Sequence, residues 1–117
     1  MRVLDLSLTY HWYDEIEAGR KPEEYREYNQ YYYNRLCYGV LQKLDGTFED
    51  CFKPYHAVRF HRGQGSRTTM LVKCEGISLG YGKPEWGAPT DKKVFIIKLG
   101  KRINYKQDNE NKKGQTA

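Results

Sequence analysis

The segment that most constrains the fold of this sequence is Gly19-Arg20-Lys21-Pro22-Glu23-Glu24-Tyr25-Arg26. Glycine readily adopts the left-handed conformation that ends a helix. If residues 23–27 form a strand, alternation allows Lys21, Glu24 and Arg26 to share one side. An ammonium, a carboxylate and a guanidinium placed together can hold a phosphate or polarise a base. The alternative is a solvated turn whose ion pairs contribute about 0 to 1 kcal/mol each.

A strand and a short helix are predicted before this segment. Leucines alternate with polar residues over 4–8, which indicates a half-buried strand ending near Thr9. Thr9 is placed to cap the next element, in which Trp12, Tyr13 and Ile16 have helical spacing. Gly19 is placed to end that helix.

The stretch after Pro22 is ambiguous from local signals. Tyrosine or leucine recurs at helical spacing at positions 25, 28, 32 and 36, and Pro22 suits the first turn of a helix. The density of tyrosine favours a strand instead. Further on, Asp45-Gly46 predicts a turn between two apolar patches.

From Tyr55 onward the pattern predicts strands at residues 57–61, 68–79 and 93–99, which are rich in Val, Ile, Thr and Phe. Residues 63–66 predict a hairpin loop between the first two strands. Residues 80–90 hold glycines and prolines that exclude regular structure, and such loops on a strand scaffold often carry function. Residues 104–117 predict a disordered, basic and polar tail, which leaves one domain at 1–103.

Length and composition exclude several classes of protein. The 117 residues suffice for one domain. A mean hydropathy of -0.91 and the lack of a long apolar run exclude a transmembrane helix, which needs about 20 residues. The N-terminus lacks the pattern of a signal peptide, so we expect a cytoplasmic protein that is not associated with a membrane.

The cysteines at 37, 51 and 74 form an odd set without a close pair, so free thiols are expected rather than disulfides or a metal site. We expect no cofactor, and a monomer as the oligomeric state.

Charge is distributed unevenly along the chain. Residues 1–50 hold 6 Lys or Arg against 10 Asp or Glu, whereas residues 51–117 hold 14 against 5. Tyrosine supplies 11 of the aromatic residues. A basic half with many aromatic rings suits a polyanion whose bases stack on those rings, so RNA or a nucleotide is a candidate ligand.

Several motifs together resemble an ASCH domain, a member of the PUA-like superfamily. The resemblance covers residues 4–102 and rests on Lys21-x-x-Glu24-Tyr25-Arg26, Asn34-Arg35-Leu36, Val58-Arg59-Phe60-His61-Arg62-Gly63, Gly76-Ile77-Ser78, Gly82-Lys83-Pro84-Glu85-Trp86-Gly87 and Val94–Gly100. It implies an α+β fold, namely a small mixed β-barrel with short flanking helices and a cleft for RNA or nucleotides. It also implies a strand at 23–27 and a short helix near 29–36.

The resemblance carries over to chemistry only in part. Some ASCH domains hydrolyse acylated cytidine with a lysine at the position of Lys21, a threonine at that of Glu24 and a carboxylate from a later loop, for which Glu85 is the candidate here. Because Glu24 replaces the threonine, we do not transfer that activity. A metal-independent hydrolase acting on a modified nucleoside or RNA remains the alternative, and a barrel that binds only proteins is a third possibility.

The leading prediction is an RNA-, nucleotide- or modified-nucleoside-binding domain with a basic cleft. Candidates for catalysis are Lys21, Glu24 and Glu85, and candidates for ligand binding are Tyr25, Arg26, Arg59, His61, Arg62, Arg67, Lys83 and Trp86. On a strand, Arg59 and His61 face away from Phe60, so they either line the cleft or are ordinary surface residues around a core Phe. Trp86 either stacks a base or plugs the barrel end. The tyrosines at 28, 31, 32 and 33 are predicted to form a helix packing face and its rim rather than a platform on which bases stack.

Overall fold

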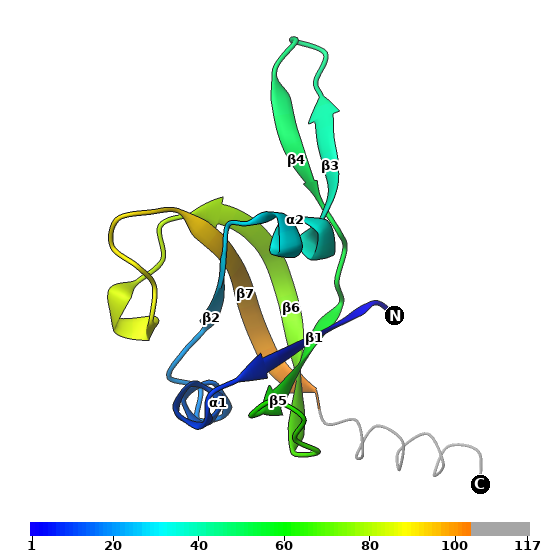
Figure 1. Ribbon diagram of the computed structural model, residues 1–117. Helices are drawn as coiled ribbons and strands as arrows, with labels where there is room; N and C mark the ends of the chain where they lie inside the picture. The colour runs from blue at the N-terminus through cyan, green and yellow to red at the C-terminus, as the bar shows by residue number, and fades with distance from the viewer. Residues whose placement is uncertain (104–117) are drawn as a thin grey trace, which may run out of the picture.

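A single curled sheet forms the centre of the protein in the computed structural model, which describes residues 1–103 (Figure 1). Its strand order is β1 (Val3–Leu8), β5 (Ala57–Arg62), β6 (Thr69–Gly80), β7 (Val94–Ile103) and β2 (Glu23–Glu27). β1 runs parallel to β5, and the other neighbours are antiparallel. The fold is therefore α+β with a mixed, half-barrel sheet, as predicted at this coarse level. The tail predicted at 104–117 lies outside the described residues.

The first strand and helix follow the predicted pattern. The leucines of β1 are buried and its alternate residues are more exposed. Helix α1 (Tyr10–Glu17) follows, and Gly19 has the left-handed φ of 80° expected after it. Thr9 is the N-cap residue of α1, but its side chain makes no capping hydrogen bond, so the prediction that it caps the helix was wrong in this respect.

The ambiguous stretch divides into a strand and a helix. β2 covers Glu23–Glu27, and α2 (Gln30–Leu36) begins after Asn29, whose side chain accepts a 2.9 Å hydrogen bond from the Tyr32 N–H. This hydrogen bond satisfies one of the N–H groups of the first turn that have no partner within the helix, so the helix begins there. Within residues 1–103, none of the helices has the length and apolar character needed to cross a membrane.

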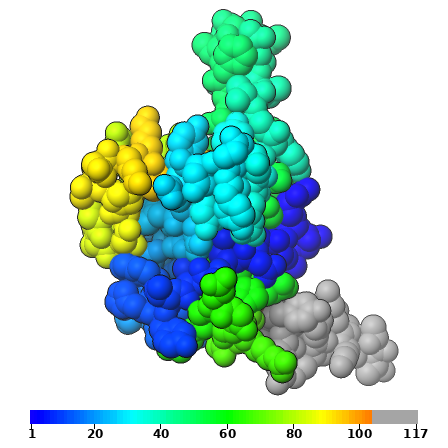
Figure 2. Space-filling model, viewed as in Figure 1, coloured from blue at the N-terminus to red at the C-terminus, as the bar shows by residue number. Residues whose placement is uncertain are grey.

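A two-stranded hairpin projects from the body beyond α2 (Figures 1 and 2). We call it the arm; it consists of β3 (Cys37–Gln42) and β4 (Phe48–Phe52), which form a sheet of their own. The predicted turn lies at its tip, where Asp45 accepts hydrogen bonds from the N–H and hydroxyl of Thr47. Gly46 supplies the left-handed φ of 88° that this turn requires.

The strands predicted in the second half are present, with β7 longer than expected because it continues to Ile103, opposite Leu71. The loop after β6 differs from the prediction in one respect. It was expected to lack regular structure, but it contains one 3-10 turn, η1 (Pro84–Trp86). Proline suits the first position of such a turn, and Gly87 ends it with a φ of 94°.

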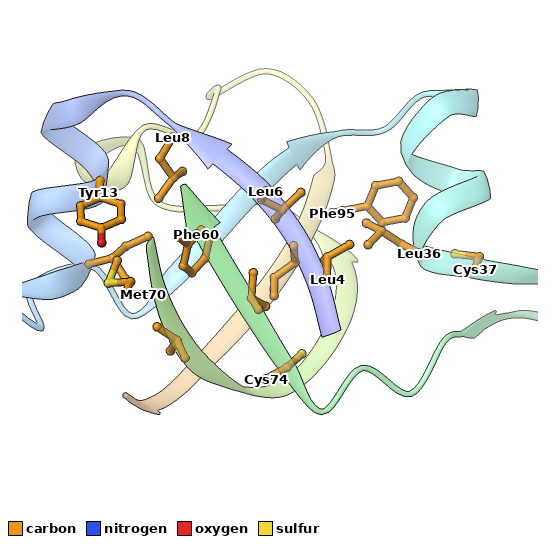
Figure 3. Packing of buried hydrophobic residues seen from close by; sticks show 14 residues of the cluster. Leu4, Leu6, Leu8, Tyr13, Leu36, Cys37, Phe60, Met70, Cys74 and Phe95 are labelled. Atoms are coloured by element: carbon orange, nitrogen blue, oxygen red, sulfur yellow. The ribbon is translucent and has the colours of Figure 1, made fainter. Parts of the chain in front are cut away.

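The core lies inside the curl of the sheet, between α1 and α2 (Figure 3). Leucines of β1 pack there with Phe60 of β5 and Phe95 of β7. Phe60 points inward while Arg59 is exposed and His61 half-buried, as strand alternation predicts. Cys37 and Cys74 are buried, and all three cysteines are free thiols.

Two arginines bond the outer edge of β1. Backbone groups at that edge have no neighbouring strand, because β1 is the end of the sheet. Arg35 of α2 donates a 2.8 Å hydrogen bond to the Asp5 carbonyl, and Arg26 of β2 donates one of 2.8 Å to the Ser7 carbonyl. These guanidinium groups satisfy carbonyls that would otherwise be free to pair with another chain.

Replacing Leu6 by alanine is expected to lower the free energy of unfolding by about 2 to 5 kcal/mol, because it leaves a cavity in the core. Leu44→Ala is the matched control, since Leu6 is 3% exposed and Leu44 is 110% exposed. We expect the control to change stability by no more than about 0.5 kcal/mol. Urea unfolding followed by circular dichroism measures both, and equal losses would contradict the assignment of the core.

Candidate functional site

A buried ion pair lies on the inner side of the sheet near its open edge. Lys21, 3% exposed, and Glu24, 5% exposed, are the buried charged residues of the described chain. The Lys21 Nζ lies 2.5 Å from Glu24 Oε1. Because an unpaired buried charge is costly, each of these groups requires the other.

Arg26 extends this pair to β1, at the opposite end of the strand order. Its Nη2 donates 2.7 Å to Glu24 Oε2 and also reaches the Ser7 carbonyl, and its Nη1 donates 3.0 Å to the Tyr32 hydroxyl. Burial acts to lower the pKa of Arg26, but the charge of Glu24 and the hydrogen bonds with Tyr32 and Glu24 together outweigh it, so the pKa is raised overall. The Arg26 Nε is buried and has no hydrogen-bond partner. Lys21, Glu24 and Arg26, which we call the charged triad, therefore join β2 to β1.

Two aromatic rings flank the ammonium of Lys21. Its Nζ lies 4.9 Å from the centre of the Trp12 ring and 5.2 Å from that of Tyr25. Ring faces attract a cation at this range, and the attraction strengthens where water is excluded. Trp12 of α1 and Tyr25 of β2 thus fix the position of the lysine from two sides.

A cleft of about 200 Å³ opens above the charged triad. It is smaller than the roughly 300 to 1,000 Å³ of sites for drug-sized ligands, so it suits one small ring or group. Its walls come from the end of β1, from α1, from β2 and from the 3-10 turn η1. The lining residues are Ser7, Leu8, Thr9, Trp12, Lys21, Glu24, Tyr25, Arg26, Trp86 and Gly87.

Glycines allow the loop after β6 to close over this cleft. A Cβ added at Gly82 would lie 2.6 Å from a ring carbon of Tyr25, and one added at Gly87 would lie 2.9 Å from a ring carbon of Trp12. A larger residue would push the loop away from these rings. The close approach brings Trp86 to the mouth of the cleft.

Tyr25 connects the loop to the sheet through its hydroxyl. The hydroxyl donates 2.7 Å to Glu23 and accepts a 3.1 Å hydrogen bond from the Lys83 N–H. Burial raises the pKa of Tyr25 to about 12; the Lys83 N–H acts against this shift, and Glu23 adds to it. The hydroxyl thus stays protonated over the physiological range.

The rest of the loop lies at the rim of the cleft. The Lys83 ammonium lies 4.6 Å from the centre of the Trp86 ring. Glu85, the candidate loop carboxylate, is exposed and is not among the residues that line the cleft. The cleft lining therefore holds Glu24 as its carboxylate.

The other predicted ligand-binding residues lie elsewhere. Arg59 and His61 extend to Asp5, at 3.3 Å and 2.9 Å, and Arg62 bonds Asp14 of α1 at 3.0 Å. Arg67 is exposed in the turn between β5 and β6. None of the four lines the cleft, and their role in ligand binding stays a prediction.

Sequence reasoning missed five residues of the cleft lining, namely Ser7, Leu8, Thr9, Trp12 and Gly87. Trp12 was assigned only to a helix face, and nothing in the local pattern of β1 indicated that its end forms a wall. The signal available in the sequence was the tryptophan itself, since the chain holds two tryptophans. Both of them line the cleft.

The tyrosines of 28–33 divide between packing and exposure. Tyr32 and Tyr33 are half-buried and pack on the core, whereas Tyr28 and Tyr31 are exposed. This division agrees with the predicted helix packing face and rim.

Comparisons with protein-family models, curated proteins and solved structures found no match for this chain. Among residues 1–103, no group of three or more His, Cys, Asp or Glu side chains is placed to hold a metal ion.

Glu24→Gln is expected to lower the free energy of unfolding by about 3 to 5 kcal/mol, because it leaves Lys21 buried without a charged partner. Lys21→Met should be similarly costly. The double variant should lose clearly less than the sum of the two single losses, since neither charge is then left alone. Urea unfolding of the four proteins measures this coupling, and additive losses would show that the pair is not coupled.

Stability is also expected to fall between pH 10 and about 12, the window set by the raised pKa of Tyr25. Above pH 10 the unfolded chain loses the phenol proton while the folded chain retains it, so alkaline pH favours unfolding. Tyr25→Phe should make this fall shallower. Thermal melts across the pH range measure it; Tyr33, whose pKa is also about 12, supplies the comparison variant Tyr33→Phe. A fall that is unchanged in Tyr25→Phe would contradict the assignment.

Proposed function

We propose that this chain is an ASCH domain of the PUA-like superfamily that binds RNA, a nucleotide or a modified nucleoside through a single base. The observation that carries the proposal is the charged triad at the floor of a small cleft lined by Trp12, Tyr25 and Trp86. The motif resemblance and the half-barrel sheet support the family assignment. The cleft volume, about 200 Å³, matches one base better than a longer ligand.

Glu24 is the group proposed to recognise the base. A carboxylate offers about four acceptor sites. Lys21 and Arg26 take one each, so acceptor capacity remains for a ligand donor. Carboxylates accept hydrogen bonds from the exocyclic amines of cytosine and adenine, and the carbonyl of uracil offers no such donor. Bases that carry an amino group are therefore the preferred class.

The aromatic and basic groups around the cleft supply the remaining contacts. Trp86 at the mouth of the cleft offers a ring face for stacking, worth about 1 to 3 kcal/mol per base. Lys83 lies beside it and is exposed, so it is placed to meet a phosphate. Lys21 and Arg26 are already paired with Glu24, so in this proposal they orient the carboxylate and do not bind phosphate.

The geometry favours binding over the hydrolase alternative. Glu24 occupies the position at which the resembling hydrolases have a threonine, and Glu85 does not line the cleft. A mechanism that uses two carboxylates therefore lacks the second carboxylate. A mechanism that uses the threonine of the resembling hydrolases lacks that hydroxyl. The binding experiment described below also detects turnover, which would favour the hydrolase.

Wild-type protein should bind cytidine or adenosine, and cytidine- or adenosine-containing single-stranded RNA, more tightly than the uridine counterparts. Trp86→Ala should weaken this binding by at least about tenfold, the equivalent of one stacking contact. Isothermal titration calorimetry at several salt concentrations measures both effects, and binding to RNA should fall as salt rises.

Tyr38→Ala is the matched control, because Tyr38 is an exposed aromatic residue on the arm, away from the cleft lining. It should bind like the wild type. Mass analysis of each mixture detects turnover, which would move the assignment to the hydrolase. No binding to any nucleoside or RNA would overturn the proposal and leave a protein-binding domain.

A further inference from the structure

The arm carries an edge strand that nothing in residues 1–103 covers. The two strands β3 and β4 pair only with each other, so each has one free edge. Large apolar side chains are exposed along the arm, including Val40, Leu41, Leu44 and Phe48. A two-stranded hairpin without a further strand or a packed face is only marginally stable in water. The arm therefore presents a surface that would gain stability from a partner.

The two free edges differ in how they are protected. Proteins commonly guard edge strands with charged residues or proline. β4 contains Glu49 and Asp50, whereas β3, Cys37–Gln42, contains no charged residue and no proline. β3 is thus the unguarded edge. Two copies of β4 would repel each other, and two copies of β3 would not.

We propose that β3 pairs in antiparallel register with β3 of a second copy of this chain, which joins the two arms into one four-stranded sheet. An antiparallel pair of identical strands has two-fold symmetry, so the edge of β3 is complementary to itself. This inference goes beyond the proposed function and replaces the expectation of a monomer.

Charge along the arm favours a second copy as the occupant. Residues 37–52 hold one cation, Lys43, against the three acids Asp45, Glu49 and Asp50, so a polyanion such as RNA would be repelled. The acids of β4 already have partners, because Glu49 pairs with Lys43 and Asp50 accepts a hydrogen bond from the Tyr33 hydroxyl. The β3 edge itself carries no charge, so it meets a second copy of itself without like-charge repulsion.

The ladder identifies the backbone groups that would form the new bonds. Lys43 N–H bonds to the Thr47 carbonyl within the hairpin. Because the direction of N–H groups alternates along a strand, Gln42 and Val40 point their N–H groups away from β4. These two amides are the ones that a second copy would protect from exchange with solvent.

Sedimentation equilibrium of the full chain over protein concentrations from about 1 μM to 1 mM tests the proposal, a range suited to an interface at the small, weak end. We expect reversible conversion to twice the monomer mass. Val40→Lys should raise the dissociation constant at least about tenfold, because it places two like charges near the two-fold axis.

Phe48→Lys is the matched control, since it makes the same kind of change at a residue of similar exposure, 66% against 61%, on the guarded strand. It should dimerise like the wild type. Equal weakening by both variants would overturn the proposal, and so would a monomer at every concentration. Hydrogen exchange of the wild type gives an independent reading, because protection of the Val40 and Gln42 amides should rise with concentration. Unchanged exchange at these amides in a dimer would also overturn it.

Discussion

The carboxylate of Glu24 is the group on which the open side of the sheet depends. It binds Lys21 and Arg26 at once, at 2.5 Å and 2.7 Å, and Arg26 in turn bonds the Ser7 carbonyl of β1. Burying three charges costs free energy, and good geometry only offsets that cost. The arrangement instead fixes the position of β2, which it holds against β1 at a place where no backbone ladder joins the two strands.

The same groups form the floor of the cleft, so fold and candidate site are not separable here. Trp12 and Tyr25 pack on the Lys21 ammonium and also line the cleft. The loop that carries Trp86 reaches them because Gly82 and Gly87 leave room for the rings. A ligand in the cleft would therefore meet side chains whose positions are already set by these contacts, which lowers the entropy cost of binding.

Local pattern was sufficient for the strands with strong alternation, such as β1, and for the turn at Asp45-Gly46. It was insufficient after Pro22, where helical spacing and tyrosine density disagreed and only the motif resemblance separated β2 from α2. Alternation along β2 accounts for Glu24 and Arg26 on one side, whereas Lys21 lies before the strand and reaches Glu24 through the path of the chain at Pro22. Trp12 was not foreseeable, because its place in the cleft depends on how α1 packs against the loop, and that is a tertiary contact between distant segments. The free edge of β3 likewise emerged only from the topology.

The two arginine bonds to the edge of β1 have a consequence for local opening. Strands joined by a ladder separate only when several backbone hydrogen bonds break together, whereas β1 and β2 are connected through the single Arg26 side chain and the packing around it. We therefore expect the gap between them to open at a lower free energy than the ladders of the sheet, and below that of global unfolding. An excursion of this kind widens the cleft without disturbing the ladders of β5, β6 and β7.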